Sequence, residues 1–531
     1  MSDFKLTYST MFNPPAELHE QFEIAMREVK WAFNDGPQDD QGRDFGVFID
    51  GKNVKTSEQI EKRSPIDQHW LLGRFHMATE VEVEGAMAAA RKAFPAWRAT
   101  PWKARIALLR QVARLIEERV YRIAAAVSLE TGKNRMEALG EVQETAVFFD
   151  HYCDLMEQNQ GFDHVLPNDP LADFVSTNRS VLKPYGAWVV IAPYNFPFAL
   201  AGGPTAAALV TGNTVVLKGA SETPWSGLLL AECIRDAGIP DGVFNYLNGS
   251  GSVAGQALVD HPHTAGITFT GSFDVGMRIV RAQFAKPYPI PCIAEMGGKN
   301  AVIVSQHADL ERAALGIIRS AFGMQGQKCS ALSRIYVEEP VADALIALLA
   351  EKINALQIGD PAVAGNWMGP VSTRKAYDDF AGYSAQLKQH GAHLITGGEQ
   401  LKSESYSAGF YCTPTLAEAP LDHPLWTVEM FLPIVMLARV KNLDEALQRA
   451  NGSRFGLTAG FYGNPQETNW FFDNIEAGVT YANRPQGATT GAWPGYQPFG
   501  GWKGSGNTGK AIASFYYLPQ YLREQSQTRI E

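Results

Sequence analysis

Apolar residues recur along this chain with two different periods. Between residues 81 and 155 they repeat every three to four positions in two long blocks, with Gly132 as a stop, which predicts helices covering a sheet. Residues 18–33 are amphipathic and predict a helix in an N-terminal extension that wraps a neighbouring surface. Residues 45–52 alternate and turn at an Asp-Gly pair, which predicts a hairpin.

In the middle of the chain, short apolar runs alternate with helical segments. The predicted strands are residues 181–191, 214–220, 243–251 and 267–272, after a loop-like stretch at 162–180. Alternating strands and helices indicate βαβ units, hence a parallel sheet with ligands at the carboxyl ends of its strands. A second alternating region, residues 300–506, predicts a second α/β domain, which would carry catalysis.

The bulk composition narrows the class of protein. At 531 residues the chain exceeds a single core, and 45% hydrophobic with 19% charged residues describes a globular protein of two large domains. A net charge of -10 argues against nucleic-acid or membrane partners. No leader pattern opens the sequence, and the five cysteines follow no pairing pattern or metal-ligand spacing. We therefore expect a cytoplasmic protein without a metal site.

One cysteine stands in a setting suited to chemistry. Cys329 follows Lys328 and a glycine turn, and Glu295 lies between an apolar run and another glycine turn. A thiol flanked by a lysine and supported by a carboxylate suits a covalent route through a thioester. The other cysteines lack an adjacent glycine and cation and fit plain packing, which is the usual role of a free cysteine; they are Cys153, Cys233, Cys292 and Cys412.

A candidate phosphate-binding turn lies between a predicted strand and a predicted helix. Gly271-Ser272 sits where backbone N–H groups at a helix start would collect phosphate, although the strict G-x-G-x-x-G pattern is absent. Lys218, at the mouth of a neighbouring strand, is a candidate for binding a ribose hydroxyl. The alternative is an ordinary exposed surface lysine.

Taken in order, these motifs resemble those of the aldehyde dehydrogenase superfamily over residues 45–506. The matching motifs are residues 193–197 for the oxyanion site, 269–272 for the phosphate turn, 295–299 for the general base and 326–329 for the nucleophile. The resemblance implies an α/β fold with a Rossmann-type parallel-sheet cofactor domain, an α/β catalytic domain and a small β-flap oligomerisation element. The implied boundaries are 1–44 for the extension, 45–158 and 183–297 for the NAD-binding domain, 298–507 for the catalytic domain, and 159–182 with 508–531 for the oligomerisation element.

The resemblance also implies an enzyme with a definite set of roles. Cys329 would attack the aldehyde, the Asn195 amide and the Cys329 backbone N–H would hold the oxyanion, and Glu295 would activate water. Glu429 would bind the nicotinamide ribose beside Phe431; the alternative for Glu429 is a solvated surface charge. The implied cofactor-binding residues are Ile191, Pro193, Lys218, Ser221, Gly271, Ser272, Glu429 and Phe431.

Some positions depart from the family pattern without removing a catalytic group. They are Tyr194, Gly219 and Leu432. The ribose-binding carboxylate often found three residues after Lys218 is here Ser221, with Glu222 next to it. A carboxylate at that place would repel the extra phosphate of NADP, so NAD is the expected cofactor and NADP remains possible.

Within the family the likeness is greatest to enzymes that oxidise L-glutamate γ-semialdehyde to L-glutamate. The long N-terminal extension and residues 321–331 and 490–501 carry it. The resemblance implies that Ser330, Gly491 and Ala492 hold the substrate carboxylate, and that Phe196, Phe322 and Phe499 line the pocket. Trp493-Pro494 replaces smaller residues, so another semialdehyde or an aliphatic or aromatic aldehyde stays open. A non-catalytic protein on this fold and a CoA-acylating enzyme are the remaining alternatives.

The family resemblance extends to assembly. A flap strand near residues 162–180 is expected to dock with a C-terminal strand near 516–524. This predicts a homodimer as the building block, with a small-molecule aldehyde as the ligand.

Overall fold

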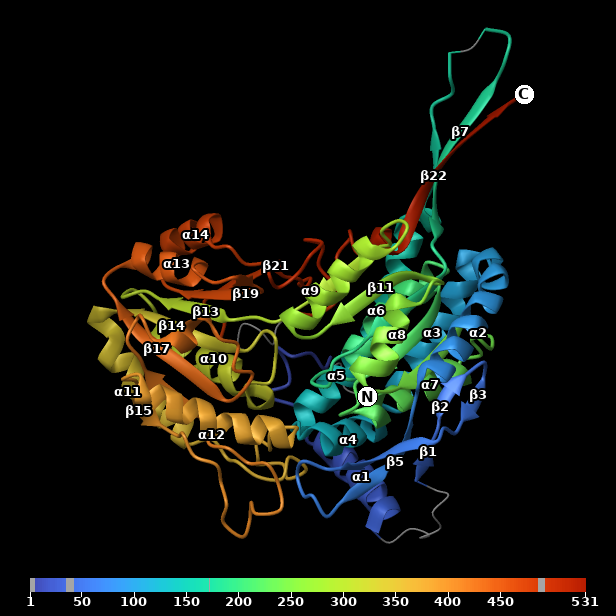
Figure 1. The fold of residues 1–531 in the computed structure, drawn as a ribbon. Coiled ribbons are helices and arrows are strands. Elements are labelled where there is room, and N and C mark those ends of the chain that lie inside the picture. Colours follow the sequence, from blue (N-terminus) through green and yellow to red (C-terminus); the bar gives the residue numbers. More distant parts are fainter. Residues whose placement is uncertain (1–4, 35–42, 171, 486–491) are drawn as a thin grey trace.

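Two seven-stranded sheets, each flanked by helices, lie side by side, and a narrow β-ribbon projects away from them (Figure 1). The computed structural model describes residues 5–34, 43–170, 172–485 and 492–531. The predicted α/β class with parallel sheets is confirmed. The predicted domain boundaries stay predictions.

The first sheet has the strand order β12-β11-β8-β9-β10-β2-β3. Its first five strands run parallel, and β2 joins β10 antiparallel. The predicted hairpin is confirmed, with Asp50 and Gly51 at φ 50° and 76° in the turn. The bounds are β2 Val47–Ile49, β3 Lys52–Val54, β8 Ala187–Ile191, β9 Thr214–Gly219, β10 Phe244–Asn248, β11 Thr264–Thr270 and β12 Cys292–Glu295. A smaller sheet beside it contains β1 Asp44–Phe45, β5 Leu71–Met77 and β4 Glu58–Arg63.

Four helices, rather than two blocks, occupy residues 80–158. Pro101 precedes the second of them, and Gly132 ends the third at φ 83°, where a Cβ would lie 2.6 Å from the Pro370 carbonyl oxygen. Proline favours the start of a helix and glycine its left-handed end, so these residues divide the periodic pattern. The helices are α2 Glu80–Ala99, α3 Trp102–Glu118, α4 Val120–Thr131 and α5 Arg135–Gln158, followed by α6 Ala199–Val210, α7 Pro224–Asp236, α8 Gln256–Asp260 and α9 Phe273–Ala282.

The second sheet has the order β15-β16-β17-β14-β13-β19-β20 and is parallel except for β15. Its strands are β13 Asn300–Val304, β14 Leu332–Glu338, β15 His393–Thr396, β16 Thr415–Glu418, β17 Ile434–Val440, β19 Thr458–Tyr462 and β20 Val479–Ala482; β18 Phe455–Gly456 pairs with β21 Trp502–Lys503. The helices are α10 Leu310–Phe322, α11 Glu339–Asn354, α12 Arg374–Gln389, α13 Leu443–Asn451 and α14 Pro465–Asn474.

The N-terminal extension forms helix α1, Ala16–Asn34, which packs against α4 as the amphipathic pattern predicted. Its buried side includes Leu18, Phe22 and Met26, which belong to the hydrophobic core around the first sheet. The parts of the molecule built around the first and second sheets are called the first and second halves. Arg135 lies over the Phe22 ring at 5.1 Å and pairs with Glu23 at 3.1 Å. The extension therefore packs on the helices of the first half.

The projecting ribbon contains β6 Asp163–Leu166, β7 Ser176–Pro184 and β22 Leu522–Ile530, in the order β22-β7-β6 (Figure 1). The predicted single strand 181–191 is wrong, because the N–H groups of Tyr185 and Gly186 both donate to Asn213 Oδ1 and separate β7 from β8. The C-terminal strand begins at 522 rather than 516, since Leu518–Tyr521 is a short helix buried in the core. In the part of the chain that the structure describes, no helix combines the length and apolarity needed to cross a bilayer.

Candidate active site

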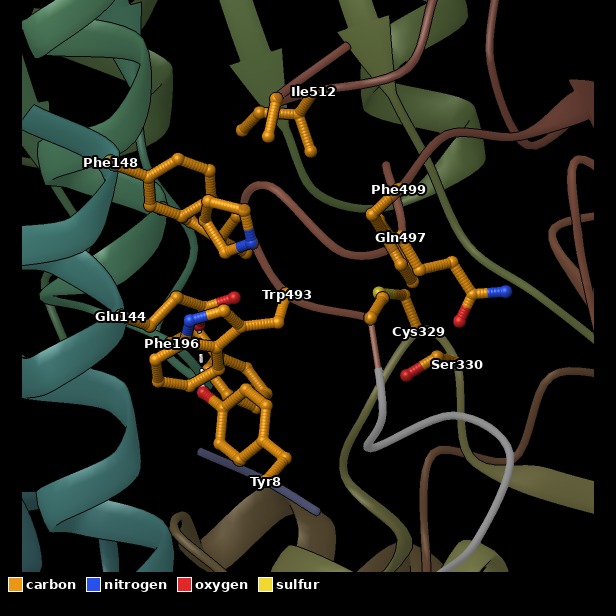
Figure 2. Close-up of a pocket in the computed structure, with 14 residues that line it drawn as sticks. Tyr8, Glu144, Phe148, Phe196, Cys329, Ser330, Trp493, Gln497, Phe499 and Ile512 are labelled. Atoms are coloured by element: carbon orange, nitrogen blue, oxygen red, sulfur yellow. Dashed lines mark hydrogen bonds between the residues drawn. The ribbon is translucent and has the colours of Figure 1, made fainter. Parts of the chain in front are cut away.

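A cavity with about 70 Å³ of water-accessible space opens beside Cys329. Figure 2 shows Cys329 and Ser330 on one side of it and Tyr8, Glu144, Phe196 and Trp493 on the other. The residues around the cavity come from distant parts of the chain; they are Tyr8, Glu144, Phe148, Phe196, Leu200, Cys329, Ser330, Ala492, Trp493, Pro494, Gln497, Phe499, Ile512 and Ala513. Five of these were predicted as site residues: Cys329, Ser330, Ala492, Phe196 and Phe499.

The loop before Cys329 has a strained backbone. Met324, Gln325 and Gly326 are left-handed in succession, with φ of 45°, 55° and 68°. Residues other than glycine rarely adopt this backbone conformation, and such strain persists only where contacts with neighbouring residues impose it. Glu137 of α5 supplies these contacts, since its carboxylate accepts from Met324 N at 2.8 Å and from Lys328 Nζ at 2.6 Å.

The expected cationic setting of the thiol is wrong. The Lys328 ammonium group is buried in its ion pair with Glu137. Burial, followed by the nearby Glu429 and Glu295 carboxylates, raises the pKa of the Cys329 thiol to about 12. Lys328 is next to the cysteine in sequence, but its side chain extends away from the thiol to Glu137. The thiol of this state is therefore protonated at neutral pH.

Helix α5 holds a second loop as well, the one that carries Asn195. Glu141, one turn after Glu137, accepts from Phe198 N at 2.8 Å and from Ala199 N at 3.2 Å, and it pairs with the buried Lys133. The Asn195 amide is buried and donates to the Gln327 carbonyl at 2.9 Å. The predicted oxyanion amide and the nucleophile loop are therefore in direct contact.

Glu295 ends strand β12 and accepts from Gly501 N at 3.2 Å. Burial raises the pKa of this carboxyl well above its usual range. A carboxyl group with a raised pKa can take up a proton near neutral pH, as a general base must. The Glu295 carboxylate also contributes to the raised pKa of the Cys329 thiol.

Glu429 is partly buried, so it is not the solvated surface charge considered as the alternative. Its carboxylate accepts from Gly298 N at 2.8 Å, and burial raises its pKa to about 7. A Cβ on Gly297 would lie 2.1 Å from the carboxylate, so glycine is required for this approach. Phe431 has φ 57° and its ring meets Tyr194 edge-to-face at 6.0 Å.

The predicted cofactor residues gather at the carboxyl edge of the first sheet. Lys218 is the penultimate residue of β9 and is 6% exposed; burial lowers its pKa to about 8, so it is not an ordinary surface lysine. Ser221 follows and donates to the Gly249 carbonyl at 3.0 Å. Ile191 and Pro193 end and follow β8, and Gly271 and Ser272 lie between β11 and α9. Among the described residues, no carboxylate lies within 4.0 Å of the Lys218 ammonium group.

Sequence reasoning missed Glu144 and Tyr8. Glu137, Glu141 and Glu144 are spaced i, i+4, i+7 and lie on one face of α5. Three carboxyl groups at helical spacing in a largely apolar helix were a sequence signal that could have pointed to Glu144. Burial raises the pKa of Glu144 to about 8.

Phe322 belongs to the core of the second sheet and does not line the cavity. Gly491 falls outside the described residues.

Comparison with known proteins gives consistent matches over nearly the whole chain. A model described as "Aldehyde dehydrogenase family" matches residues 53–526. A 1-pyrroline-5-carboxylate dehydrogenase of Geobacillus sp. (strain WCH70) is 38% identical over 514 residues, covering 96% of this chain and 95% of that protein. The crystal structure of 1-pyrroline-5-carboxylate dehydrogenase from Thermus with bound NAD is similar at TM-score 0.91 and 32% identity, covering 100% of this chain and 99% of that one.

A proline utilization A protein from Bdellovibrio bacteriovorus is similar at TM-score 0.89 and 34% identity. The match covers 96% of this chain and 51% of that protein, so this chain spans about half the length of that relative.

Proposed function

The chain belongs to the aldehyde dehydrogenase family, and on that premise we propose that it oxidises L-glutamate γ-semialdehyde to L-glutamate with NAD. The relatives named 1-pyrroline-5-carboxylate dehydrogenase support this substrate, and the NAD complex of the Thermus protein supports this cofactor. NADP use remains the alternative for the cofactor.

One observation in the structure carries the substrate assignment. The cavity is apolar and aromatic over most of its wall, yet it places Ser330 beside the nucleophile and the Glu144 carboxyl group opposite it (Figure 2). A short aldehyde with an amino acid head would present an ammonium group to Glu144 and a carboxylate to the Ser330 hydroxyl. Ala492 lines the same cavity and would contact that carboxylate.

In the proposed reaction the Cys329 sulfur adds to the aldehyde carbon. Its proton passes to solvent water as the C–S bond forms, and the oxygen that becomes anionic is held by the Asn195 amide and the Cys329 backbone N–H. The Asn195 amide has a second hydrogen besides the one it donates to Gln327, so it can act without losing that contact. Loss of hydride from the carbon produces the thioester on Cys329.

Water then attacks the thioester while Glu295 takes its proton. The C–S bond breaks, the acid is released and the thiol is restored. Because Glu295 supplies the base, hydrolysis is favoured over transfer of the acyl group to a second thiol such as CoA. These roles also explain why a purely structural protein on this fold is the weaker alternative.

The residues at the carboxyl edge of the first sheet fit a dinucleotide. The buried Lys218 ammonium group, the start of α9 and the Glu429 carboxylate suit a ribose, a phosphate and a second ribose respectively. Lys218, Ser221, Gly271, Ser272 and Glu429 would hold it, with Ile191, Pro193 and Phe431 packing beside it. When bound, the nicotinamide supplies a positive charge beside the thiol and accepts the hydride.

A panel of aldehydes tests the proposal. Glutamate γ-semialdehyde, succinate semialdehyde and short aliphatic and aromatic aldehydes would each be assayed with NAD and with NADP. We expect the highest kcat/KM with glutamate γ-semialdehyde and NAD. The ring-rich wall of Phe148, Phe196 and Phe499 makes an apolar aldehyde the second candidate, and a preference for one would overturn the first.

The nucleophile is tested separately. Cys329→Ala should abolish oxidation and leave NAD binding, followed by fluorescence titration, unchanged. Retained turnover would exclude Cys329 as the attacking group. Cys292→Ala, which changes a cysteine outside the cavity, is the matched control and should keep full activity.

We further propose a cytoplasmic homodimer. The five free thiols suit a reducing compartment. The projecting ribbon exposes Val165, Leu166, Phe174, Val175 and Ile530. An exposed apolar surface of this kind favours association with a second copy.

A further inference from the structure

The N-terminal segment, residues 5–12, lies against the substrate cavity. Tyr8 lines the cavity with 6% exposure, and its hydroxyl donates to Glu144 Oε2 at 2.8 Å. Its ring meets the Trp493 ring edge-to-face, with centroids 5.2 Å apart. Figure 2 shows the three side chains grouped across the cavity from Cys329. A segment more than 300 residues from the nucleophile therefore contributes to the same pocket.

Helix α5 leaves room for the tyrosine ring. A Cβ added to Gly140 would lie 2.9 Å from Tyr8 Cε1, closer than a carbon contact allows. Glycine costs stability in the middle of a helix, so its presence here needs a reason in the packing. The close approach of the Tyr8 ring to Gly140 provides one, and the Tyr8 hydroxyl reaches Glu144 on the same helix.

Outside the cavity, two contacts within the segment and two contacts to the second half of the molecule hold residues 5–12 in place. Thr7 and Thr10 close a tight turn around Tyr8 through Thr10 N to Thr7 O at 3.1 Å and Thr7 N to Thr10 Oγ1 at 2.8 Å. Arg484 Nη2 donates to Ser9 Oγ at 2.8 Å, and the Arg319 guanidinium group lies 3.7 Å from the Phe12 ring centroid. Tyr8 is thus positioned by both halves of the molecule.

Trp493 adds an unused hydrogen-bond donor to this wall. Its side chain is 2% exposed and lines the cavity, and its indole Nε1 has no hydrogen-bond partner among the described residues. Buried N–H groups are rarely left without an acceptor, and this one borders a cavity that could admit one. An oxygen of a bound substrate would satisfy this donor.

We propose that residues 5–12 form a wall of the substrate pocket and that Tyr8 and Trp493 determine its selectivity. The Tyr8 hydroxyl fixes the Glu144 carboxyl group for the amino group of the aldehyde, and the Trp493 indole N–H donates to an oxygen of its carboxylate. This inference rests on the proposed function, because it assigns two more groups to the head of the same substrate.

Three aldehydes of equal chain length separate these roles. L-Glutamate γ-semialdehyde carries both head groups, 5-oxopentanoate carries only the carboxylate, and pentanal carries neither. Tyr8→Phe should raise KM about tenfold for the first substrate alone, with kcat retained. Trp493→Phe should raise KM by a similar factor for the first two substrates and leave pentanal unchanged.

The pH dependence gives a readout that a packing role would not move. Glu144 is faced by the Tyr8 hydroxyl, by Glu141 of its own helix, and by the ammonium groups of Lys133 and Lys328. The Tyr8 hydrogen bond favours the carboxylate form, so losing it should raise the pKa of Glu144. In Tyr8→Phe the pH at which KM for the amino aldehyde improves should therefore move upward.

Tyr411→Phe is the matched control, because it removes the hydroxyl group of another buried tyrosine, which donates to the Ile66 carbonyl at 3.3 Å away from the cavity, and it should keep the selectivity of the unaltered enzyme. If Tyr8→Phe changes all three substrates equally, or none, the inference is overturned. A parent enzyme that prefers pentanal would instead overturn the proposed substrate. If the unaltered enzyme prefers the semialdehyde and the Tyr8 and Trp493 variants keep that preference, the proposed substrate stands and only the inferred role of residues 5–12 and Trp493 is overturned.

Discussion

Replacing Glu137 with alanine should disable the nucleophile loop while leaving Cys329 in the chain. The Glu137 carboxylate is buried and accepts from Lys328 Nζ at 2.6 Å, Met324 N at 2.8 Å and Asn134 Nδ2 at 3.0 Å. Two of these donors belong to the loop. Without the carboxylate, the Lys328 ammonium group and the Met324 N–H stay buried without their partner.

The magnitude follows from two contributions. Removing one partner of a buried ion pair costs about 3–5 kcal/mol of stability. The left-handed Met324 and Gln325 each hold about 1–3 kcal/mol of backbone strain, which the loop would release once its anchor is gone. A displacement of the sulfur by about 1 Å lowers the rate of the chemical step about 100-fold. We therefore expect a fall of that order in kcat, beyond any loss of stability.

The assay is steady-state kinetics at saturating NAD, combined with thermal unfolding of the same samples. Glu130→Ala is the matched control, because Glu130 is an equally buried carboxyl group that accepts from Trp225 N at 2.8 Å and Ser226 N at 2.9 Å, away from the cavity. It should lower the unfolding temperature but keep kcat. If folded Glu137→Ala keeps kcat within about threefold of the parent, the loop does not depend on this anchor.

Three further results are expected. Gly297→Ala should raise KM for NAD at least about tenfold by displacing Glu429, whose carboxylate would lie 2.1 Å from the new Cβ; an unchanged KM would separate Glu429 from cofactor binding. Because the pKa of the Cys329 thiol is raised to about 12, its alkylation by iodoacetamide without NAD should quicken about tenfold per pH unit from about pH 7 to 10, and a plateau near about pH 8.5 would contradict this. Deleting residues 522–531 removes the partner of β7 and should yield monomers in analytical ultracentrifugation; intact dimers would place the interface elsewhere.

Periodicity and residue type predicted much of the fold. The parallel strands and the Asp50-Gly51 hairpin could be located because local pattern and tertiary structure agree there. The strand predicted over 181–191 was wrong because the Asn213 side chain, distant in sequence, takes both N–H groups at the break. Tertiary hydrogen bonds of this kind leave no trace in a local window.

The site divides in the same way. Cys329 and Ser330 were predicted from their motif and do lie at the cavity. The effect of Lys328 on the thiol was predicted wrongly. Lys328 precedes Cys329 in sequence, but its ammonium group pairs with the buried Glu137 carboxylate instead of lying beside the thiol. Tyr8 could not be found at all, because only the folded chain brings residues 5–12 against α5.

The anchoring of two loops on one helix has a mechanical consequence. Cys329 emerges between α10 and β14 of the second half, but Glu137 fastens its loop to α5 of the first half, where Glu141 also fastens the loop of Asn195. If the halves rock against each other as ligands enter and leave, the sulfur and the amide will travel together as one rigid body. The backbone that links the Cys329 loop to β14 will then bend, and the distance between the Cys329 sulfur and the Asn195 amide will stay constant during the motion.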